Sequence, residues 1–154
     1  MSQTINNQKK FVVNQNEKIA KRINDDLSII QQIILENFNY VESIILAGGF
    51  GRGEGSVLIY EEEIQPINDY DLYVITKFDN QKNIINKVRK LISSIIKIRQ
   101  VDLEVIPIKK LKSLKPTMAN YDLKYASYVF YGNNQILNSI PIIDSQKLSL
   151  KEGR

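Results

Sequence analysis

The chain has 154 residues, of which 43% are hydrophobic and 25% are charged, and its formal net charge is +4. These values are typical of one globular domain with a sizeable core. The small positive charge suits a phosphate-bearing ligand but does not by itself indicate nucleic acid. Cysteine and histidine are both absent, which excludes disulfides, thiolate or imidazole metal ligands and histidine general bases.

The ends of the chain carry no targeting or membrane signal. The N-terminus is polar and lacks the apolar centre of a secretory signal, and no apolar run is long enough to cross a bilayer. We therefore expect a cytoplasmic protein without a membrane partner. We predict a flexible arm over residues 1–12 and a single domain over residues 13–154. Residues 148–154 resemble the start of a further helix, which would fit the N-terminal part of a longer protein with an additional C-terminal domain.

The first half of the chain reads as a helix, a strand and a glycine turn. Helical spacing of apolar residues over 14–37 predicts a long amphipathic helix. Residues 41–47 are short, apolar and β-branched, which favours a buried strand. Residues 48–55 contain five glycines, which allow positive φ and close backbone approach, so we predict no regular structure there. Residues 56–67 are interpreted as an excursion in the form of a short hairpin.

The second half alternates strands with helices. We predict a strand over 71–76, an amphipathic helix over 80–98 and a half-buried strand over 101–108. A short helix follows over 117–126, with Thr117 as its cap. This order predicts an α+β fold, in which a twisted mixed β-sheet is backed by helices on one side.

Four carboxylates occupy alternate positions on two of these segments. Asp69 and Asp71 should project to one side of the first strand, and Asp102 and Glu104 to one side of the second. If the two strands pair, three or four carboxylates converge. Two such charges about 4 Å apart repel by roughly 4 kcal/mol at a surface-like effective dielectric of about 20, so the cluster calls for a cation. Carboxylate oxygens without His or Cys select hard ions, which favours Mg²⁺ or Mn²⁺.

The glycine turn supplies the other half of the predicted site. Its backbone N–H groups can surround phosphate oxygens, especially if a helix begins after Phe50. Arg52 lies in this turn, where its guanidinium can contact phosphate as a charged fork. A pair of divalent ions opposite such a turn forms a clamp for in-line phosphoryl or nucleotidyl displacement.

These segments resemble a known superfamily when taken together. The run Gly48-Gly49-Phe50-Gly51-Arg52-Gly53-Glu54, followed by Asp69-Tyr70-Asp71 and then Val101-Asp102-Leu103, is similar to the DNA polymerase beta-like nucleotidyltransferases. Their pattern is a Gly-Ser or Gly-Gly turn, an Asp-x-Asp between hydrophobic residues and a third carboxylate on a later strand. The turn looks closest to bacterial nucleotidyltransferase domains. The resemblance covers about residues 40–108.

The resemblance implies a role for each of these residues. Asp69 and Asp71 would be catalytic and would ligate both metal ions, and Asp102 would ligate the ion that activates the acceptor hydroxyl. An NTP would be the nucleotide substrate. The residues that would meet its triphosphate are Gly48, Gly49 and Arg52.

The sequence departs from the superfamily pattern in two places. The common serine after the first glycine is Gly49 here, and the gap between the turn and Asp69 is lengthened by residues 56–67. Glu104 is also an alternative to Asp102 as the third ligand, because both should lie on one face of their strand.

A dinucleotide-binding turn is the main structural alternative. Gly49-Phe50-Gly51 begins that fingerprint, and Asp69 follows about twenty residues later, where such motifs place an acid. Two features oppose it. Glu54 takes the place of the third glycine, and Asp69 precedes its strand instead of ending one.

Two hypotheses for function follow. The first is a metal-dependent nucleotidyltransferase that moves a nucleoside monophosphate from an NTP to an acceptor hydroxyl and releases pyrophosphate. The acceptor is unspecified and could be a small molecule, a protein or RNA. The second is a catalytically weak or inactive module with the same fold, which acts as a nucleotide-binding or antitoxin-type partner protein.

Overall fold

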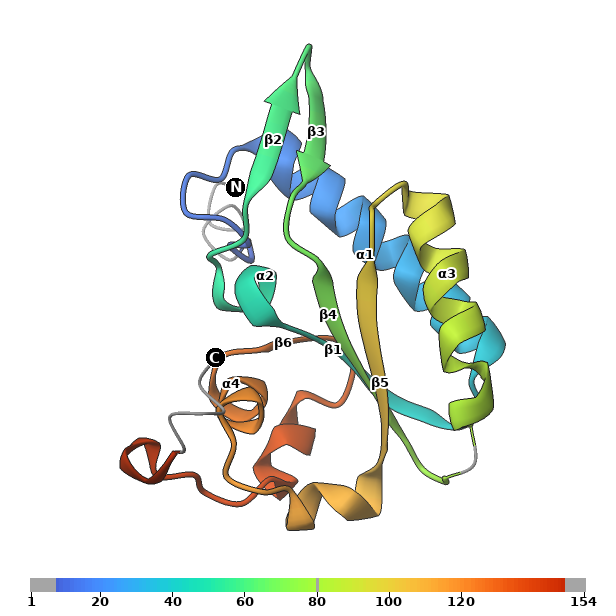
Figure 1. Ribbon diagram of the computed structural model, residues 1–154, viewed down its shortest axis with the longest axis vertical. Helices are drawn as coiled ribbons and strands as arrows, with labels where there is room; N and C mark the ends of the chain where they lie inside the picture. The colour runs from blue at the N-terminus through green and yellow to red at the C-terminus, as the bar shows by residue number, and fades with distance from the viewer. Residues whose placement is uncertain (1–7, 80, 149–154) are drawn as a thin grey trace, which may run out of the picture.

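The computed structural model describes residues 8–79 and 81–148, and these form a four-stranded sheet, a two-stranded ribbon and the helices around them (Figure 1). The helices and strands, in chain order, are α1 (Glu17–Asn37), β1 (Val41–Ala47), α2 (Gly48–Arg52), β2 (Val57–Tyr60), β3 (Glu63–Pro66), β4 (Tyr70–Thr76), α3 (Ile85–Ile96), β5 (Val101–Pro107), α4 (Met118–Tyr125) and β6 (Tyr128–Gly132). Short 3₁₀ helices connect or follow them, namely η2 (Lys82–Ile84), η3 (Ile108–Ser113), η4 (Asn134–Ser139) and η5 (Ser145–Lys147).

The main sheet is mixed, and its strand order is β5-β4-β1-β6. β1 pairs antiparallel with β4 and β6, whereas β4 and β5 are parallel. A parallel pair needs a crossover connection, and α3 supplies it. The register of this pair places Asp71 opposite Asp102 and Tyr73 opposite Glu104. The two strands that carry the acidic residues therefore pair, which is the condition under which their carboxylates were expected to converge.

Helices α1 and α3 cover one face of the sheet (Figure 1). Leu72, Val74 and Val105 belong to the same buried cluster as the apolar stripes of these two helices. The opposite face is covered in part by α4, η3 and η4, with Ile45 and Ile106 buried beneath them. The mixed sheet backed by helices confirms the predicted fold class, but the cover on the second face was not predicted.

Helix α1 begins where the sequence supplies a cap. The Asn16 side chain accepts a hydrogen bond from the Ile19 N–H at 2.9 Å. Inside the helix, Asp26 is almost completely buried. It accepts the Tyr70 hydroxyl at 2.7 Å and the Arg22 guanidinium at 3.0 Å. Burial raises the pKa of Asp26, while the bonds to Tyr70 and Arg22 oppose that rise. This network ties α1 to the first residue of β4, next to the acidic residues.

Strands β2 and β3 form a ribbon that projects from the body of the molecule (Figure 1). Its base is closed by two hydrogen bonds, from the Ile67 N–H to the Ser56 carbonyl at 2.8 Å and from the Ser56 N–H to the Asn68 side chain at 2.7 Å. Glu61 and Glu62 form the turn with positive φ values of 49° and 71°. The hairpin predicted over residues 56–67 is therefore present.

Several boundaries differ from the prediction. Phe11 and Val12, at the end of the segment predicted as a flexible arm, are buried, and Val12 bridges to Gly55; residues 1–7 lie outside the described part. The glycine segment is not wholly irregular, because Gly48–Arg52 forms one turn of helix. The helix predicted over residues 80–98 is shorter, with α3 preceded by the 3₁₀ turn η2. The helix start predicted over residues 148–154 falls outside the described residues after position 148.

None of the helices among the described residues combines the length and the apolar character needed to span a bilayer.

Candidate active site

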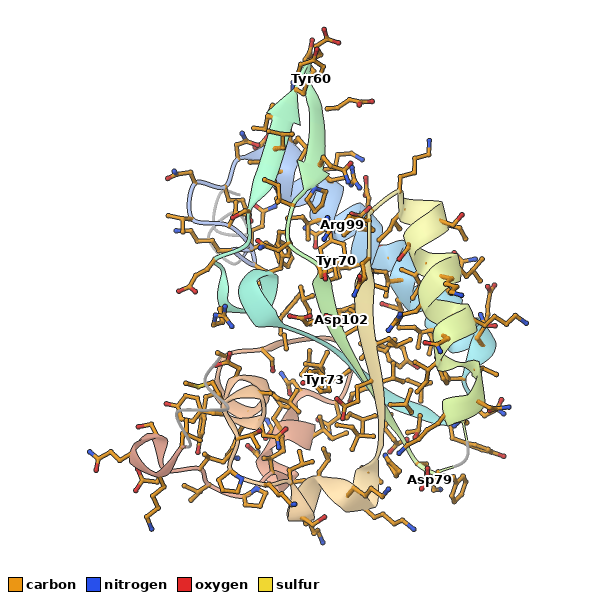
Figure 2. All side chains as sticks on the ribbon, in the orientation of Figure 1. Tyr60, Tyr70, Tyr73, Asp79, Arg99 and Asp102 are labelled. Carbon is orange, nitrogen blue, oxygen red and sulfur yellow. The ribbon has the colours of Figure 1, made fainter. Side chains whose placement is uncertain are left out.

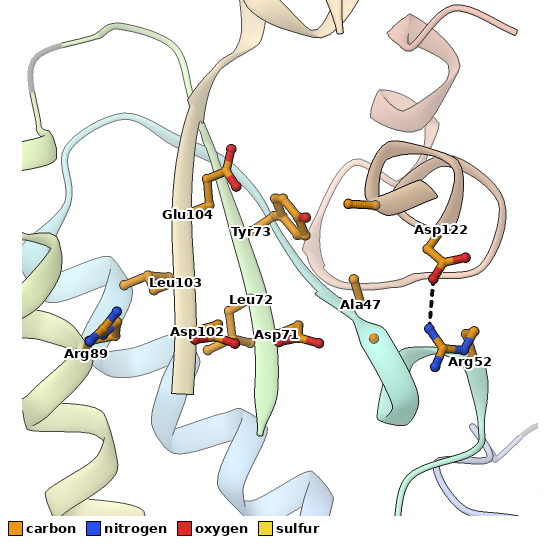
Figure 3. Close-up of a pocket in the computed structure, with 12 residues that line it drawn as sticks. Ala47, Arg52, Asp71, Leu72, Tyr73, Arg89, Asp102, Leu103, Glu104 and Asp122 are labelled. Atoms are coloured by element: carbon orange, nitrogen blue, oxygen red, sulfur yellow. Dashed lines mark hydrogen bonds and ion pairs between the residues drawn. The ribbon is translucent and has the colours of Figure 1, made fainter. Parts of the chain in front are cut away.

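A pocket of about 420 Å³ opens beside the starts of β4 and β5, between α2 and α4 (Figure 3). Its polar lining comes from five different elements, and this brings together side chains far apart in the sequence. The charged and phenolic side chains in this lining belong to Arg52, Asp71, Tyr73, Arg89, Asp102, Glu104 and Asp122, and Gly48 contributes backbone.

Asp71 and Asp102 form the acidic centre of the pocket. They lie opposite each other on the paired strands and point into the same space (Figure 3). Burial raises the pKa of Asp71 to about 6, and a hydrogen bond and negative charge from Asp102 add to the rise. Asp69 adds repulsion, and Arg52 counteracts it. Gln100 donates to Asp102 Oδ1 at 3.1 Å. The pair is therefore an electrostatically frustrated site that a proton or a cation would relieve.

Glu104 and Tyr73 occupy the next level of the same face. Glu104 lies opposite Tyr73, not opposite Asp71. Burial raises the pKa of the Tyr73 phenol to about 12, with further contributions from Glu104 and then from the other nearby acids. The phenol thus stays protonated at neutral pH and can donate a hydrogen bond into the pocket. Of the two acids predicted as alternatives on β5, Asp102 is the one beside Asp71.

The backbone at Gly48 approaches the acidic pair too closely for any side chain. Gly48 has a positive φ of 68°, and a Cβ built on it would lie 1.9 Å from Asp71 Oδ2. The next residue differs, because a Cβ on Gly49 would meet its nearest heavy atom at 3.7 Å. Only the first glycine of the turn is therefore required by the contact with Asp71, and Gly49 has room for a side chain.

Arg52 leaves the end of α2 and points toward α4. Its Nη1 donates to Asp122 Oδ2 at 2.8 Å, shown as the dashed line in Figure 3, and its Nε lies 3.2 Å from Glu54 Oε1. Both arginine contacts are partly exposed, with 36% of the Arg52 side chain accessible. The guanidinium is held at the pocket wall by two carboxylates that a phosphate could replace.

The remaining predicted residues lie close to the pocket but are not part of its lining. Asp69 precedes β4 and acts on Asp71 through charge, and Gly49 lies in the first turn of α2. Within residues 8–79 and 81–148, no group of three or more acidic side chains is arranged to hold a metal ion. The structure brings together Asp71 and Asp102, while the metal-binding roles of Asp69, Asp71 and Asp102 stay a prediction.

The sequence did not identify Asp122, Arg89 or Tyr73 as site residues. Asp122 lies in α4, seventy positions after the arginine it binds. Arg89 lies on the polar side of α3 and lines the pocket from beyond β5 (Figure 3). Tyr73 is the exception that could have been found, because it follows Asp71 by two positions and therefore shares its face of the strand.

The sequence matches no protein-family model and no curated protein. Several solved structures are similar to the chain. A mutant form of the toxin–antitoxin pair MntA–HepT contains a chain that is 12% identical, with a TM-score of 0.50 over 73% of this chain and 76% of that one. A spectinomycin adenyltransferase, AAD(9), from Enterococcus faecialis is 15% identical, with a TM-score of 0.48 over 82% of this chain and 61% of its own. A third structure, of a tri-AMPylated HEPN toxin with MNT antitoxin from Shewanella oneidensis, gives 13% identity and a TM-score of 0.47 over 74% and 75%. The sheet order β5-β4-β1-β6 and the helices around it thus form a fold shared with a chain of the MntA–HepT pair.

Proposed function

We propose that this protein is a metal-dependent nucleotidyltransferase, which moves a nucleoside monophosphate from an NTP to an acceptor hydroxyl. One observation carries the proposal. Asp71 and Asp102 lie in register on paired strands, and they line the same pocket as Gly48 and Arg52. A dinucleotide-binding turn would have no need for this acidic pair, because its chemistry places one acid on a ribose.

The donor set of the pocket fits Mg²⁺ or Mn²⁺. Asp71 and Asp102 offer hard oxygen ligands, and their mutual repulsion, expressed in the raised pKa of Asp71, is the feature that a divalent cation would relieve. These two residues would hold the ion, with Asp69 as a further ligand. When bound, such an ion lowers the pKa of an attacking hydroxyl and neutralises charge on the phosphates.

The residues of the chain bind and orient the reactants. Arg52 exchanges Asp122 for phosphate oxygens, and Gly48 lets the triphosphate approach the acidic pair. The acceptor oxygen then bonds to the α-phosphorus while the bond to the bridging oxygen breaks. Pyrophosphate leaves, and the hydroxyl proton passes to solvent.

The test is transfer from an NTP labelled on its α-phosphate, with pyrophosphate release measured in parallel. Asp71→Ala should abolish both while its circular dichroism spectrum stays that of the parent. Glu36→Ala is the matched control, because it removes one exposed carboxylate from the end of α1. Unchanged transfer by Asp71→Ala would contradict the proposal.

A nucleotide-binding or antitoxin-type partner protein is the second candidate. Two observations favour it: Arg52 is engaged by two carboxylates, and Gly49 lacks a hydroxyl. One chain of the structure of the toxin–antitoxin pair MntA–HepT shares this fold. Calorimetry with a non-hydrolysable ATP analogue separates the candidates. Tight binding without turnover of any acceptor tested would favour the partner protein.

A further inference from the structure

A second recess, of about 250 Å³, lies next to the pocket at the open edge of β5. Its lining consists of Arg89, Lys90, Ser93, Arg99, Gln100 and Val101, and we call it the basic recess. Arg89 lines both this recess and the pocket of the acidic pair. The two hollows therefore meet at one side chain.

The cations of the basic recess have no acidic partners in the described part of the chain. The described part of the chain contains four arginines. Two of them, Arg22 and Arg52, each form an ion pair with a carboxylate. Arg89, Lys90 and Arg99 take part in no ion pair among residues 8–79 and 81–148. Three neighbouring positive charges that form no ion pair among the described residues repel one another, so an anion in their midst would be favourable.

The basic recess lies on the opposite side of the acidic pair from Arg52. Figure 3 shows Asp71 and Asp102 between Arg89 on one side and Arg52 on the other. Figure 2 shows Arg99 and Asp102 toward the same end of β5. Gln100, which lines the recess, donates to Asp102 at 3.1 Å. A molecule in the recess would therefore lie beside the β5 acid, away from the glycine turn.

We propose that the basic recess binds a phosphate group of the acceptor, so that the acceptor is a phosphate-bearing molecule. This inference rests on the proposed function, in which the triphosphate of the NTP occupies the side of Arg52. Two guanidinium groups provide paired N–H donors that match phosphate oxygens, and Lys90 adds a point charge. Arg89, at the junction, shields the incoming phosphate from the negative charge of Asp102.

The experiment is a titration of the isotope-labelled chain with inorganic phosphate, followed by NMR. The Nε–Hε signals of Arg89 and Arg99 should shift saturably, whereas sodium chloride of equal ionic strength should not move them. Arg89→Gln and Arg99→Gln should each weaken phosphate binding about tenfold, the effect of losing roughly one charge-assisted hydrogen bond. Lys87→Gln, which removes an exposed charge from the same helix outside the recess, should bind as the parent does.

A second arm separates acceptor phosphate from nucleotide phosphate. With Mg²⁺ and a saturating non-hydrolysable ATP analogue, phosphate should still shift the signals of Arg89 and Arg99. Displacement of phosphate by the analogue would assign the recess to the nucleotide and overturn the proposal. Absence of a saturable shift up to about 0.15 M ionic strength, or equal binding by both glutamine variants, would also overturn it. Failure of the proposed function is measured separately, as absence of transfer from the NTP labelled on its α-phosphate, an outcome that leaves phosphate binding in the recess unaffected.

Discussion

Replacing Gly48 by alanine should disable the pocket while leaving most of the stability. Alanine at a φ of 68° costs about 1–2 kcal/mol, and the stiffer unfolded chain offsets about 0.4–1 kcal/mol of this. The new Cβ would lie 1.9 Å from Asp71 Oδ2. The half-buried Asp71 side chain must therefore rotate away from Asp102. A net loss of about 1 kcal/mol corresponds to a fall in melting temperature of roughly 2–4 °C for a chain of this size.

Two measurements follow the Gly48→Ala variant. Binding of a non-hydrolysable ATP analogue with Mg²⁺, measured by calorimetry, should be lost. The pKa of the Asp71 carboxyl, followed by carbon NMR, should fall from about 6 toward its ordinary value as the group turns to solvent. Gly49→Ala is the control for the Asp71 measurement, because its nearest neighbour would be 3.7 Å from the new Cβ, and the pKa of Asp71 should stay at about 6 in this variant. Parent-like binding and an unmoved Asp71 pKa in Gly48→Ala would refute the reasoning.

Three further predictions concern other parts of the site. Burial and Asp102 raise the pKa of Asp71 from 3.8 to about 6. The folded state therefore binds the proton more tightly than the unfolded state. As a result, the metal-free protein loses stability as the pH rises from 3.8 to about 6. Asp71→Asn should therefore be more stable than the parent by about 1–2 kcal/mol at pH 8, after discounting for solvent screening, and urea unfolding should show no difference below about pH 4. Tyr70→Phe removes the 2.7 Å bond to Asp26 and should cost about 2 kcal/mol in urea unfolding, with nucleotide binding kept; an unchanged midpoint would show that Arg22 alone satisfies Asp26. Asp122→Asn releases Arg52 and should lower the dissociation constant of an ATP analogue by up to about fivefold, whereas weaker binding would mean that Asp122 orients the arginine for phosphate.

Local patterns in the sequence were sufficient to predict β1, β4 and β5 and the face of the sheet on which Asp71 and Asp102 lie. The β-branched run that forms β1 and the alternation along β5 predict where each strand lies in the sequence. They also predict on which face of the sheet each side chain lies. The same alternation placed Asp71 and Asp102 on one face once their strands paired. These features depend on a period of two residues, which neighbouring residues alone reveal.

Local sequence patterns did not predict the helical turn α2. Glycine disfavours helix, and three of the five residues in Gly48–Arg52 are glycine. Phe50 explains the outcome, because it is fully buried and its ring packs against that of Tyr70 at a centroid distance of 5.1 Å. Tertiary burial thus overrides local propensity.

The charge partners of the pocket could not be read from the sequence either. The Arg52–Asp122 pair joins residues seventy positions apart, and Arg89 has the appearance of an ordinary solvated residue on an amphipathic helix. Which polar side chains converge depends on how α3 and α4 pack at the edges of the sheet, and no short-range pattern carries that information.

The closed base of the β2–β3 ribbon has a consequence for variation in length. The bonds among Ser56, Ile67 and Asn68 bring the two ends of the ribbon together before the chain enters β4. Residues added or removed at the Glu61–Glu62 turn would lengthen or shorten the ribbon without moving the point at which Asp71 is delivered. The long segment between the glycine turn and β4 should therefore tolerate insertions at its turn, because added residues there would not displace Asp71.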